Sequence, residues 1–316
     1  MVGEMIKVYR YEPKYKSLWD RFVAEAKNGI FLFYRDYMEY HSDRFSDFSL
    51  LFYDDNRLAA VMSANIRDDL LFSHGGLTFG GVISDDKMKT PLMLEIFDAL
   101  KEYLKAQGIT KVVYKAIPYI YHDVPAEEDL YALFLHNAKL VRRDVSSTIF
   151  MKEKIAFSKG RKWAVKKSKS SGLGVRQSYD FKTFMSIEED NLRGKYGVKP
   201  THTAEEIQLL ADRFPENIKL FAAYENEIMV AGVIIYENKN VAHTQYIAST
   251  DEGKGLFAGD LILDFLISEH YREKKYLDFG ISTEKEGRFL NVGLITQKEE
   301  FGARAVVYDT YELDMH

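Results

Sequence analysis

The sequence predicts an α/β (α+β) protein built from two tandem domains of the same kind. Three observations support this: one pattern of residues occurs twice, both occurrences lie in the same order of predicted elements, and 316 residues suffice for about two domains. Each domain is expected to contain a mixed, mostly antiparallel sheet flanked by helices. The expected domains are residues 1–155 and 156–316.

The repeat begins at the end of a predicted helix. Asp43-Arg44-Phe45 precedes a strand, a polar turn and a second strand, and Asp212-Arg213-Phe214 precedes the same series. Tyr53 corresponds to Tyr224 and Ala60 to Ala231, both at a shift of 171 residues. Solenoid units are about 20–50 residues long, so a repeat of this length indicates a duplicated domain. Two similar domains side by side favour a ligand site at their interface.

In the first copy, helical spacing of Leu18, Phe22 and Val23 predicts a helix over residues 17–27. Pro91 near the start and Gly108 after the end delimit an amphipathic helix over residues 90–106. The other predicted elements are a helix at 34–45, strands at 49–53, 58–65, 70–74, 111–116 and 145–151, and a helix at 127–137.

The second copy repeats this order. The predicted elements are helices at 181–193, 204–214, 257–272 and 291–300, and strands at 220–224, 229–236, 241–249, 276–279 and 305–313. Hairpins make the first strands antiparallel, and a helical crossover favours parallel pairing afterwards. The most basic stretch of the chain, about residues 158–172, lies between the copies.

Composition excludes several classes of function. The net charge of −5 argues against stable DNA binding, because nucleic-acid-binding domains are usually basic. The absence of cysteine excludes disulfides, a thiolate nucleophile and cysteine-ligated metals. Neither metal-ligand histidine spacing nor a Gly-x-Ser-x-Gly elbow occurs. Without a signal peptide or a run of about 18 apolar residues, the protein is expected to be cytoplasmic, with no transmembrane segment.

Gly253-Lys254-Gly255, between a strand and a helix, allows three interpretations. One is a dinucleotide loop with Asp278 as the ribose-binding acid, although the preceding strand belongs to an antiparallel meander. Another is an ordinary surface turn. The third is a phosphate loop, in which N–H groups at a helix N-terminus bind the anion.

The third interpretation rests on a resemblance to the pyrophosphate loop of GNAT acyltransferases, which binds coenzyme A. It would make Thr250, Gly253, Lys254 and Gly255 the cofactor-binding residues. Thr250 stands where that family has Arg or Gln, and Asp251-Glu252 bring negative charge to the mouth of the loop.

The C-terminal part carries a second resemblance. Asp278-Phe279-Gly280 ends a strand, and Lys298 is followed two residues later by Phe301-Gly302 at the end of a helix. This resembles the C-terminal signature of the FemABX peptidyltransferases and related FemAB-like proteins, which are two GNAT-like domains in tandem. The basic stretch resembles their Arg/Lys-rich helix that ends in Gly before the second domain. The resemblance covers nearly the whole chain.

The resemblance implies transfer of an acyl or aminoacyl group onto an amine. The best-known members take amino acids from aminoacyl-tRNA and place them on peptidoglycan precursors. The expected function is therefore an acyl- or aminoacyltransferase acting on an amine of a cell-envelope or other anionic precursor. Its expected donor is acyl-CoA or aminoacyl-tRNA, with no metal. The alternative is a degenerate tandem GNAT-like protein that binds a ligand or partner without catalysis.

The resemblance also implies roles for single residues. Lys298 would neutralise a phosphate or the developing oxyanion, positioned by Phe301-Gly302, although a solvated lysine beside acidic neighbours is the alternative. From its place at the end of the crossover strand, Asp278 is expected to orient the amine or a backbone turn, with a structural role as the alternative. From the residues alone, His74 is a candidate general base, with an ordinary strand-end histidine as the alternative. The expected substrate-binding residues are Arg161, Lys162, Lys166, Lys167, Tyr196, Phe301 and Gly302.

Overall fold

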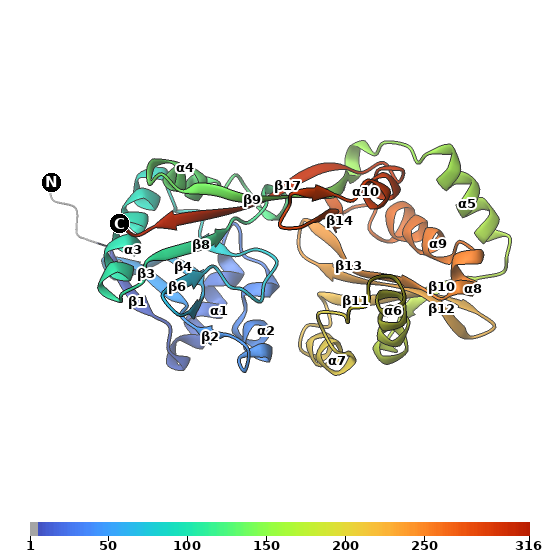
Figure 1. The fold of residues 1–316 in the computed structure, drawn as a ribbon, viewed down its shortest axis with the longest axis horizontal. Coiled ribbons are helices and arrows are strands. Elements are labelled where there is room, and N and C mark those ends of the chain that lie inside the picture. The colour runs from blue at the N-terminus through green and yellow to red at the C-terminus, as the bar shows by residue number, and fades with distance from the viewer. Residues whose placement is uncertain (1–5) are drawn as a thin grey trace. The chain divides into compact units, whose positions relative to one another are not determined.

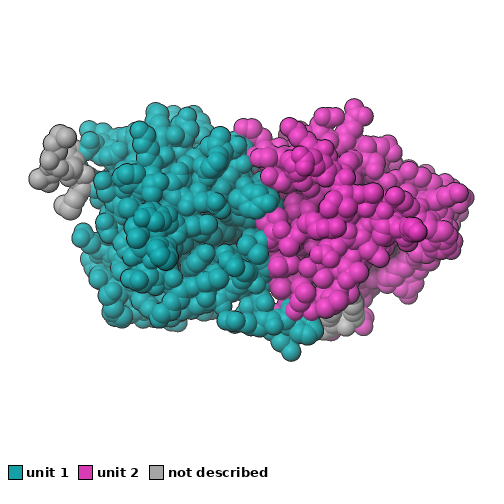
Figure 2. Space-filling view, turned by 90° about the horizontal axis from the view of Figure 1, so that it is seen from above, with its two compact units in different colours: residues 1–144, 285–289, 307–316 teal, residues 145–284, 290–306 magenta. Residues whose placement is uncertain are grey.

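The structure is a computed structural model that describes residues 6–316, apart from the side chains of Lys195 and Tyr196. The chain divides into two compact units (Figure 2). Unit 1 contains the chain up to Asp144 together with Lys285–Phe289 and Val307–His316, and unit 2 contains Val145–Glu284 and Leu290–Val306. Two C-terminal segments thus belong to unit 1, and the expected boundary after residue 155 stays a prediction.

Unit 1 contains an antiparallel sheet in the order β1-β3-β4-β7. Its strands are β1 (Lys7–Arg10), β3 (Leu50–Asp54), β4 (Arg57–Ser63) and β7 (Gly81–Ser84). Further strands are β2 (Ser46–Asp47), β5 (Asn65–Arg67), β6 (Leu70–Phe72) and β8 (Lys111–Lys115), of which β6 and β8 pair in parallel. The helices are α1 (Lys16–Glu25), α2 (Arg35–Met38), α3 (Thr90–Ala106) and α4 (Glu128–Leu135).

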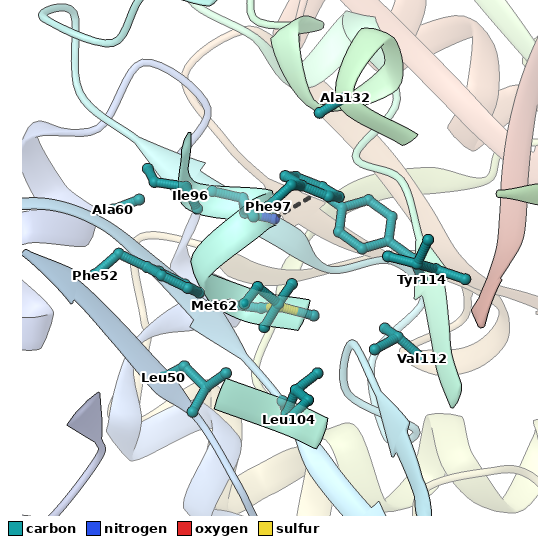
Figure 3. Close-up of a cluster of buried hydrophobic side chains, with 14 of the residues drawn as sticks. Leu50, Phe52, Ala60, Met62, Ile96, Phe97, Leu104, Val112, Tyr114 and Ala132 are labelled. Carbon is teal, nitrogen blue, oxygen red and sulfur yellow. Dashed lines mark hydrogen bonds between the residues drawn. The ribbon is translucent and has the colours of Figure 1, made fainter. Parts of the chain in front are cut away.

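The core of unit 1 forms around α3. This helix starts with Pro91 in its first turn, and Gly108 follows its end with a φ of +76°. Its apolar face, with Ile96, Phe97 and Leu104, gathers with side chains of β3, β4 and β8 (Figure 3). Full burial of one such side chain contributes about 1.5–3 kcal/mol.

Unit 2 contains an antiparallel series of β10 (Gly174–Ser178), β11 (Ile218–Glu225), β12 (Ile228–Glu237) and β13 (Val241–Ser249). Strand β14 (Tyr276–Ile281) pairs in parallel with β13 and antiparallel with β9 (Lys139–Phe150). Strands β9 and β17 (Arg304–Asp314) supply residues to both units. The pair β15 (Thr283–Glu284) and β16 (Phe289–Leu290) forms a short ribbon.

The helices of unit 2 cover both faces of its sheet. Figure 1 shows α6 (Phe181–Tyr196) and α7 (Ala204–Arg213) on one face, and α5 (Lys159–Lys169) and α9 (Ala258–Phe265) on the other. The short helix α8 (Asp251–Gly255) precedes α9, and α10 (Val292–Glu299) precedes β17. Within residues 6–316, no helix combines the length and apolar character that a membrane crossing requires.

The two units repeat one hairpin in the same register. In the β3–β4 hairpin the pairing is irregular between Phe52 and Tyr53. In β11–β12 the irregularity lies between Ala223 and Tyr224, so Tyr53 and Tyr224 occupy equivalent positions, as the sequence predicts. A bulge is a specific feature of a sheet, and its recurrence at one position supports duplication. The predicted fold class is confirmed.

The third strand differs between the units. In unit 2, β13 pairs with β12 and, at its start, with β14. In unit 1 two strands divide the equivalent pairings between them. Strand β7 pairs with β4, the equivalent of β12, and β6 pairs with β8, the equivalent of β14. Residues 73–80 separate β6 from β7. Unit 2 therefore keeps one continuous strand where unit 1 has two strands and a loop.

Candidate functional site

Strands β13 and β14 separate within unit 2. Their parallel pairing consists of three residue pairs and ends where His243 faces Asp278. Just beyond, the β12–β13 register shifts so that Gln245 is left out of the regular pairing. Such a bulge bends its strand. Residues 244–249 of β13 therefore have no β14 partner in the described pairing. Three of them, Ile247, Ala248 and Ser249, border an opening that belongs to a cavity.

A buried polar cluster lies where the two strands separate. The Asp278 carboxylate accepts hydrogen bonds of 2.6 Å from Ser146 Oγ and Thr148 Oγ1, and its Oδ2 lies 2.7 Å from His243 Nδ1. Burial raises the pKa of Asp278, but the hydrogen bonds from His243, Ser146 and Thr148 outweigh it and hold the pKa below its usual value. Asp278 is fully buried, and its predicted role in the reaction stays a prediction.

Lys298 points from the last turn of α10 to the end of β14. Its Nζ donates hydrogen bonds of 2.8 Å to the carbonyl oxygens of Gly280 and Ile281. Burial lowers the pKa of Lys298 to about 8, with the Asp278 carboxylate acting in the opposite direction. At pH 7 the side chain is still mostly an ammonium with three N–H donors, and two of them are used. The third donor has no hydrogen-bond partner among the described residues.

The helix end that holds Lys298 is built by Phe301 and Gly302. The Phe301 ring is buried, with its centroid 5.2 Å from that of Phe157 and 5.9 Å from that of Phe279. Gly302 has a φ of +88°, and a Cβ there would meet the Ile155 carbonyl oxygen at 2.2 Å. The motif therefore fixes the end of α10 and, through it, the direction of Lys298.

A cavity of about 890 Å³ lies beside the C-terminal end of β13. Its lining includes Ser249 and Thr250 after the opening, Gln297 next to Lys298, and residues of α6. Among the latter is Glu188, which is 8% exposed. Burial raises the pKa of the Glu188 carboxyl to about 7. The side chains of unit 2 thus bring a proton-accepting group and the end of β13 to one cavity.

The predicted pyrophosphate loop forms the short helix α8, and its role as a cofactor site stays a prediction. The Gly253 N–H donates to Thr250 Oγ1 at 3.0 Å, so it is already used inside the turn. A Cβ on Gly253 would meet the Val230 carbonyl oxygen at 2.1 Å, which explains this glycine by packing. Asp251 and Glu252 occupy the exposed first turn, and Lys254 pairs with Asp251 at 2.8 Å. Gly255 has no neighbour that a Cβ would contact.

The basic stretch is helix α5, and its cations divide into two groups. Arg161 is structural: it pairs with Asp260 of α9 at 2.8 Å and with Glu300 at 3.0 Å. Lys162 and Lys166 are exposed, and Lys167 Nζ lies 5.0 Å from the centroid of the Phe257 ring. The outer face of α5 also carries Trp163, which is 57% exposed. This face offers cations and an aromatic surface to a ligand.

Two further predicted residues are His74 and Tyr196. His74 lies in unit 1, buried, with its ring stacked on that of His41 at a centroid distance of 5.2 Å. Burial lowers the pKa of His74 to about 3, and nearby His41 adds to this, so His74 is a weak base near neutral pH. The side chain of Tyr196 lies outside the described residues, and its predicted role stays a prediction.

No protein-family model matches the sequence, and no curated protein matches it. Solved structures match its fold. FemX superposes with a TM-score of 0.67 over 96% of each chain at 13% identity. The C-terminal domain of a putative lysylphosphatidylglycerol synthetase from Agrobacterium fabrum gives 0.55 over 81% of each chain at 10% identity. A tandem GNAT protein from the clavulanic acid biosynthesis pathway gives 0.50 over 98% of this chain and 99% of its own at 9% identity.

The chain has a FemAB-like tandem GNAT fold. The predicted resemblance is confirmed at this level, because the similarity extends over nearly the whole length of both chains for FemX. At identities of 9–13% it concerns the fold alone. The chemistry must therefore be argued from the residues of the site.

Register shows that the polar cluster belongs to one unit. The three parallel pairs of β13 and β14 end with His243 facing Asp278, and the three parallel pairs of β6 and β8 end with Phe72 facing Val113. Unit 1 thus has apolar residues at the equivalent positions. Of these residues, the sequence indicated Asp278 and Lys298.

Proposed function

We propose that unit 2 transfers an aminoacyl or acyl group from an activated carbonyl donor to an amine of an anionic, cell-envelope-type precursor. The observation that carries this proposal is the buried Lys298 ammonium, held by two carbonyl oxygens beside the separation of β13 and β14, with one donor to spare. The fold similarity to FemX and to a putative lysylphosphatidylglycerol synthetase supports the same class of reaction.

The chemistry needs no covalent enzyme intermediate. The lone pair of the amine attacks the carbonyl carbon, negative charge develops on the carbonyl oxygen, and the bond to the leaving atom then breaks. A preorganised donor aimed at that oxygen is worth several kcal/mol in a site that excludes water. Lys298 supplies such a donor, and the Asp278 cluster with the Phe301-Gly302 helix end fixes its position.

The donor is proposed to be an aminoacyl ester on a polyanionic carrier such as tRNA. The acidic turn at Asp251 and Glu252 disfavours the diphosphate of coenzyme A, because like charges repel. The exposed cations and Trp163 on the outer face of α5 favour a nucleic acid backbone and an unstacked base. Lys162, Lys166 and Lys167 are the proposed contacts.

A transfer assay tests the proposal. The full chain is incubated with radiolabelled aminoacyl-tRNAs or, separately, with labelled acyl-CoA, together with precursor extracts that contain amines. Amide product is scored by its survival in mild alkali, which cleaves the donor ester. Label in an alkali-stable product supports a transferase, whereas binding of donor or acceptor without product supports the non-catalytic alternative.

Lys298→Ala is the decisive variant. A hydrogen bond to a charged group contributes about 1.5–3 kcal/mol, which corresponds to a roughly ten- to hundredfold slower transfer. Lys274→Ala is the matched control, because Lys274 is also a largely buried lysine that donates to a backbone carbonyl, that of Asn238 at 2.7 Å. Equal rates for Lys298→Ala and the control would remove Lys298 from the reaction.

A further inference from the structure

Glu188 occupies a position where its helix otherwise presents apolar side chains to the sheet. Phe181, Phe184 and Met185 are buried on the same face of α6, at spacings of three and four residues. Helix α6 lies close to β12 here, because a Cβ on Gly232 would meet the Phe184 ring at 2.4 Å. In unit 1, buried Trp19, Phe22 and Val23 of α1 have the same spacing. Buried Ala26, at the C-cap of α1, stands at the position that corresponds to Glu188. Unit 2 has a carboxyl where that pattern has a methyl group.

The carboxyl group of Glu188 lies in a cavity whose lining also carries charged side chains from other positions. Tyr246 of β13 is electrostatically coupled to it, and the Tyr246 hydroxyl lies 2.7 Å from His202 Nδ1. Asp190 on α6 and Asp251 on α8 line the same cavity. Lys254, the lysine in this lining, already pairs with Asp251. The lining therefore carries an excess of negative charge, which attracts a cation.

An acceptor amine enters such a site as a cation. A lysine-type ammonium has a pKa of about 10.4, so at neutral pH almost all of it is protonated and has no lone pair for attack. A group that removes one proton works best when its own pKa lies near the working pH. The burial that raises the pKa of Glu188 to about 7 supplies this property at the cavity wall.

We infer that Glu188 is the proton acceptor for a cationic primary amine that binds in the α6–β13 cavity, the acceptor side of the transfer. This inference rests on the proposed function and names the class of acceptor. Asn191 supports the geometry: its Nδ2 donates to the Ser249 carbonyl at 2.9 Å and so ties α6 to the end of β13. The amine would thus lie between the carboxyl of Glu188 and the carbonyl carbon at the opening.

The ammonium gives one proton to the Glu188 carboxylate and becomes a neutral amine. Its lone pair forms the C–N bond, and the acyl C–O bond of an ester, or the C–S bond of a thioester, breaks with its electrons on the leaving atom. The second proton lost by nitrogen goes to that leaving atom. Glu188 then releases its proton to water, and no oxidant or metal is required.

Transfer to two different acceptor amines distinguishes proton removal by Glu188 from a purely structural role of Glu188. Nα-acetyl-lysine is protonated at neutral pH, whereas hydroxylamine is not. Both are offered to the full chain with the donor that the wild type accepts. General-base catalysis contributes about a hundredfold or more, so Glu188→Gln should slow transfer to Nα-acetyl-lysine by at least about a hundredfold at neutral pH. Transfer to hydroxylamine should stay within about threefold of wild type.

The pH profile adds an independent test. The deficit of Glu188→Gln with Nα-acetyl-lysine should shrink as the pH approaches the amine pKa of about 10.4, because the amine then arrives neutral. Glu189→Gln is the matched control: Glu189 is the neighbouring residue and pairs with Arg193 at 2.7 Å. It should behave as wild type with both acceptors.

The outcomes distinguish the two claims. A Glu188→Gln variant that is equally slow with both acceptors, or as fast as wild type with both, overturns the inference and leaves the transferase intact. A wild-type protein that transfers to no acceptor overturns the proposed function and this inference with it. As a measurement that needs no turnover, the Glu188 carboxyl resonance should titrate near pH 7 in ¹³C NMR; a midpoint at the ordinary glutamate value also overturns the inference.

Discussion

The buried charge of Lys298 makes a prediction about stability that requires no substrate. Replacement by Met keeps the length of the side chain but removes the titrating group. The pKa of this lysine is lowered from 10.5 to about 8 in the folded protein. The cost of burying its charge is therefore fully present below about pH 8, and it is relieved as the pH rises from about 8 to 10.5.

The size of the effect follows from proton linkage. At pH 9 the folded protein has lost most of the Lys298 proton, while the unfolded chain, with a lysine pKa of about 10.4, still holds it. The wild type should therefore gain roughly 1 to 1.5 kcal/mol in free energy of unfolding relative to Lys298→Met between about pH 7 and pH 9. All other titrating groups are common to both proteins, so their contributions cancel in the difference.

Urea denaturation of both proteins at the two pH values measures this difference directly. The slopes of the unfolding free energy against urea must agree between the proteins, so that a shift of midpoint reports stability alone. A difference that does not change between pH 7 and pH 9 would refute the reasoning. Lys298 would then titrate as an exposed lysine, and the donor that we assign to the oxyanion would lie in water.

Two further predictions concern α5 and the polar cluster. The double variant Lys162→Ala with Lys166→Ala should weaken tRNA binding and lower the slope of log affinity against log salt by about one to two. The control double variant Lys101→Ala with Lys105→Ala on α3 should do neither. Filter binding at several salt concentrations measures both quantities, and unchanged affinity at low salt would exclude α5 from the tRNA-binding surface. Asp278→Val alone should lower the free energy of unfolding by about 3 kcal/mol, because His243 loses its partner. Adding His243→Phe should recover part of that loss, because unit 1 has Val113 and Phe72 at the equivalent positions. Urea unfolding of the two single variants and the double variant measures the coupling, and additive losses would contradict it.

Elements with local signals could be predicted from the sequence. Pro91, the apolar spacing and Gly108 define α3 in both the sequence and the structure. The predicted helix at 34–45 is wrong over most of its length, because α2 spans only Arg35–Met38 and is followed by a 3-10 turn at Glu39–His41. Strand β7 was missed; it starts at Gly81, which has a φ of +94°. The short strands β1 and β10 were also missed.

The site was only partly predictable, for a physical reason. Lys298, Phe301 and Gly302 lie within one turn of helix end, so a local motif reveals them. His243, Ser146 and Thr148 come from strands far apart in the sequence, and only the register of β9, β13 and β14 brings them to Asp278. Glu188 had a local signal that the sequence analysis did not use: a carboxyl on the apolar stripe of a helix.

Perturbed pKa values alone do not locate the site, because burial perturbs groups in both units. In unit 1, burial lowers the pKa of Lys115 to about 8, and its Nζ donates to the Leu77 carbonyl. A cavity of about 770 Å³ there is lined by Arg44, Arg67 and Lys115, with Asp43 as the acidic residue of that lining. Such a lining attracts anions and offers no buried carboxyl to take a proton from an amine. The cavity of unit 2 has the opposite charge and contains Glu188, and the same unit contains the separated strands and the spare donor of Lys298. This combination, and not any single perturbed group, argues that the transfer chemistry belongs to unit 2.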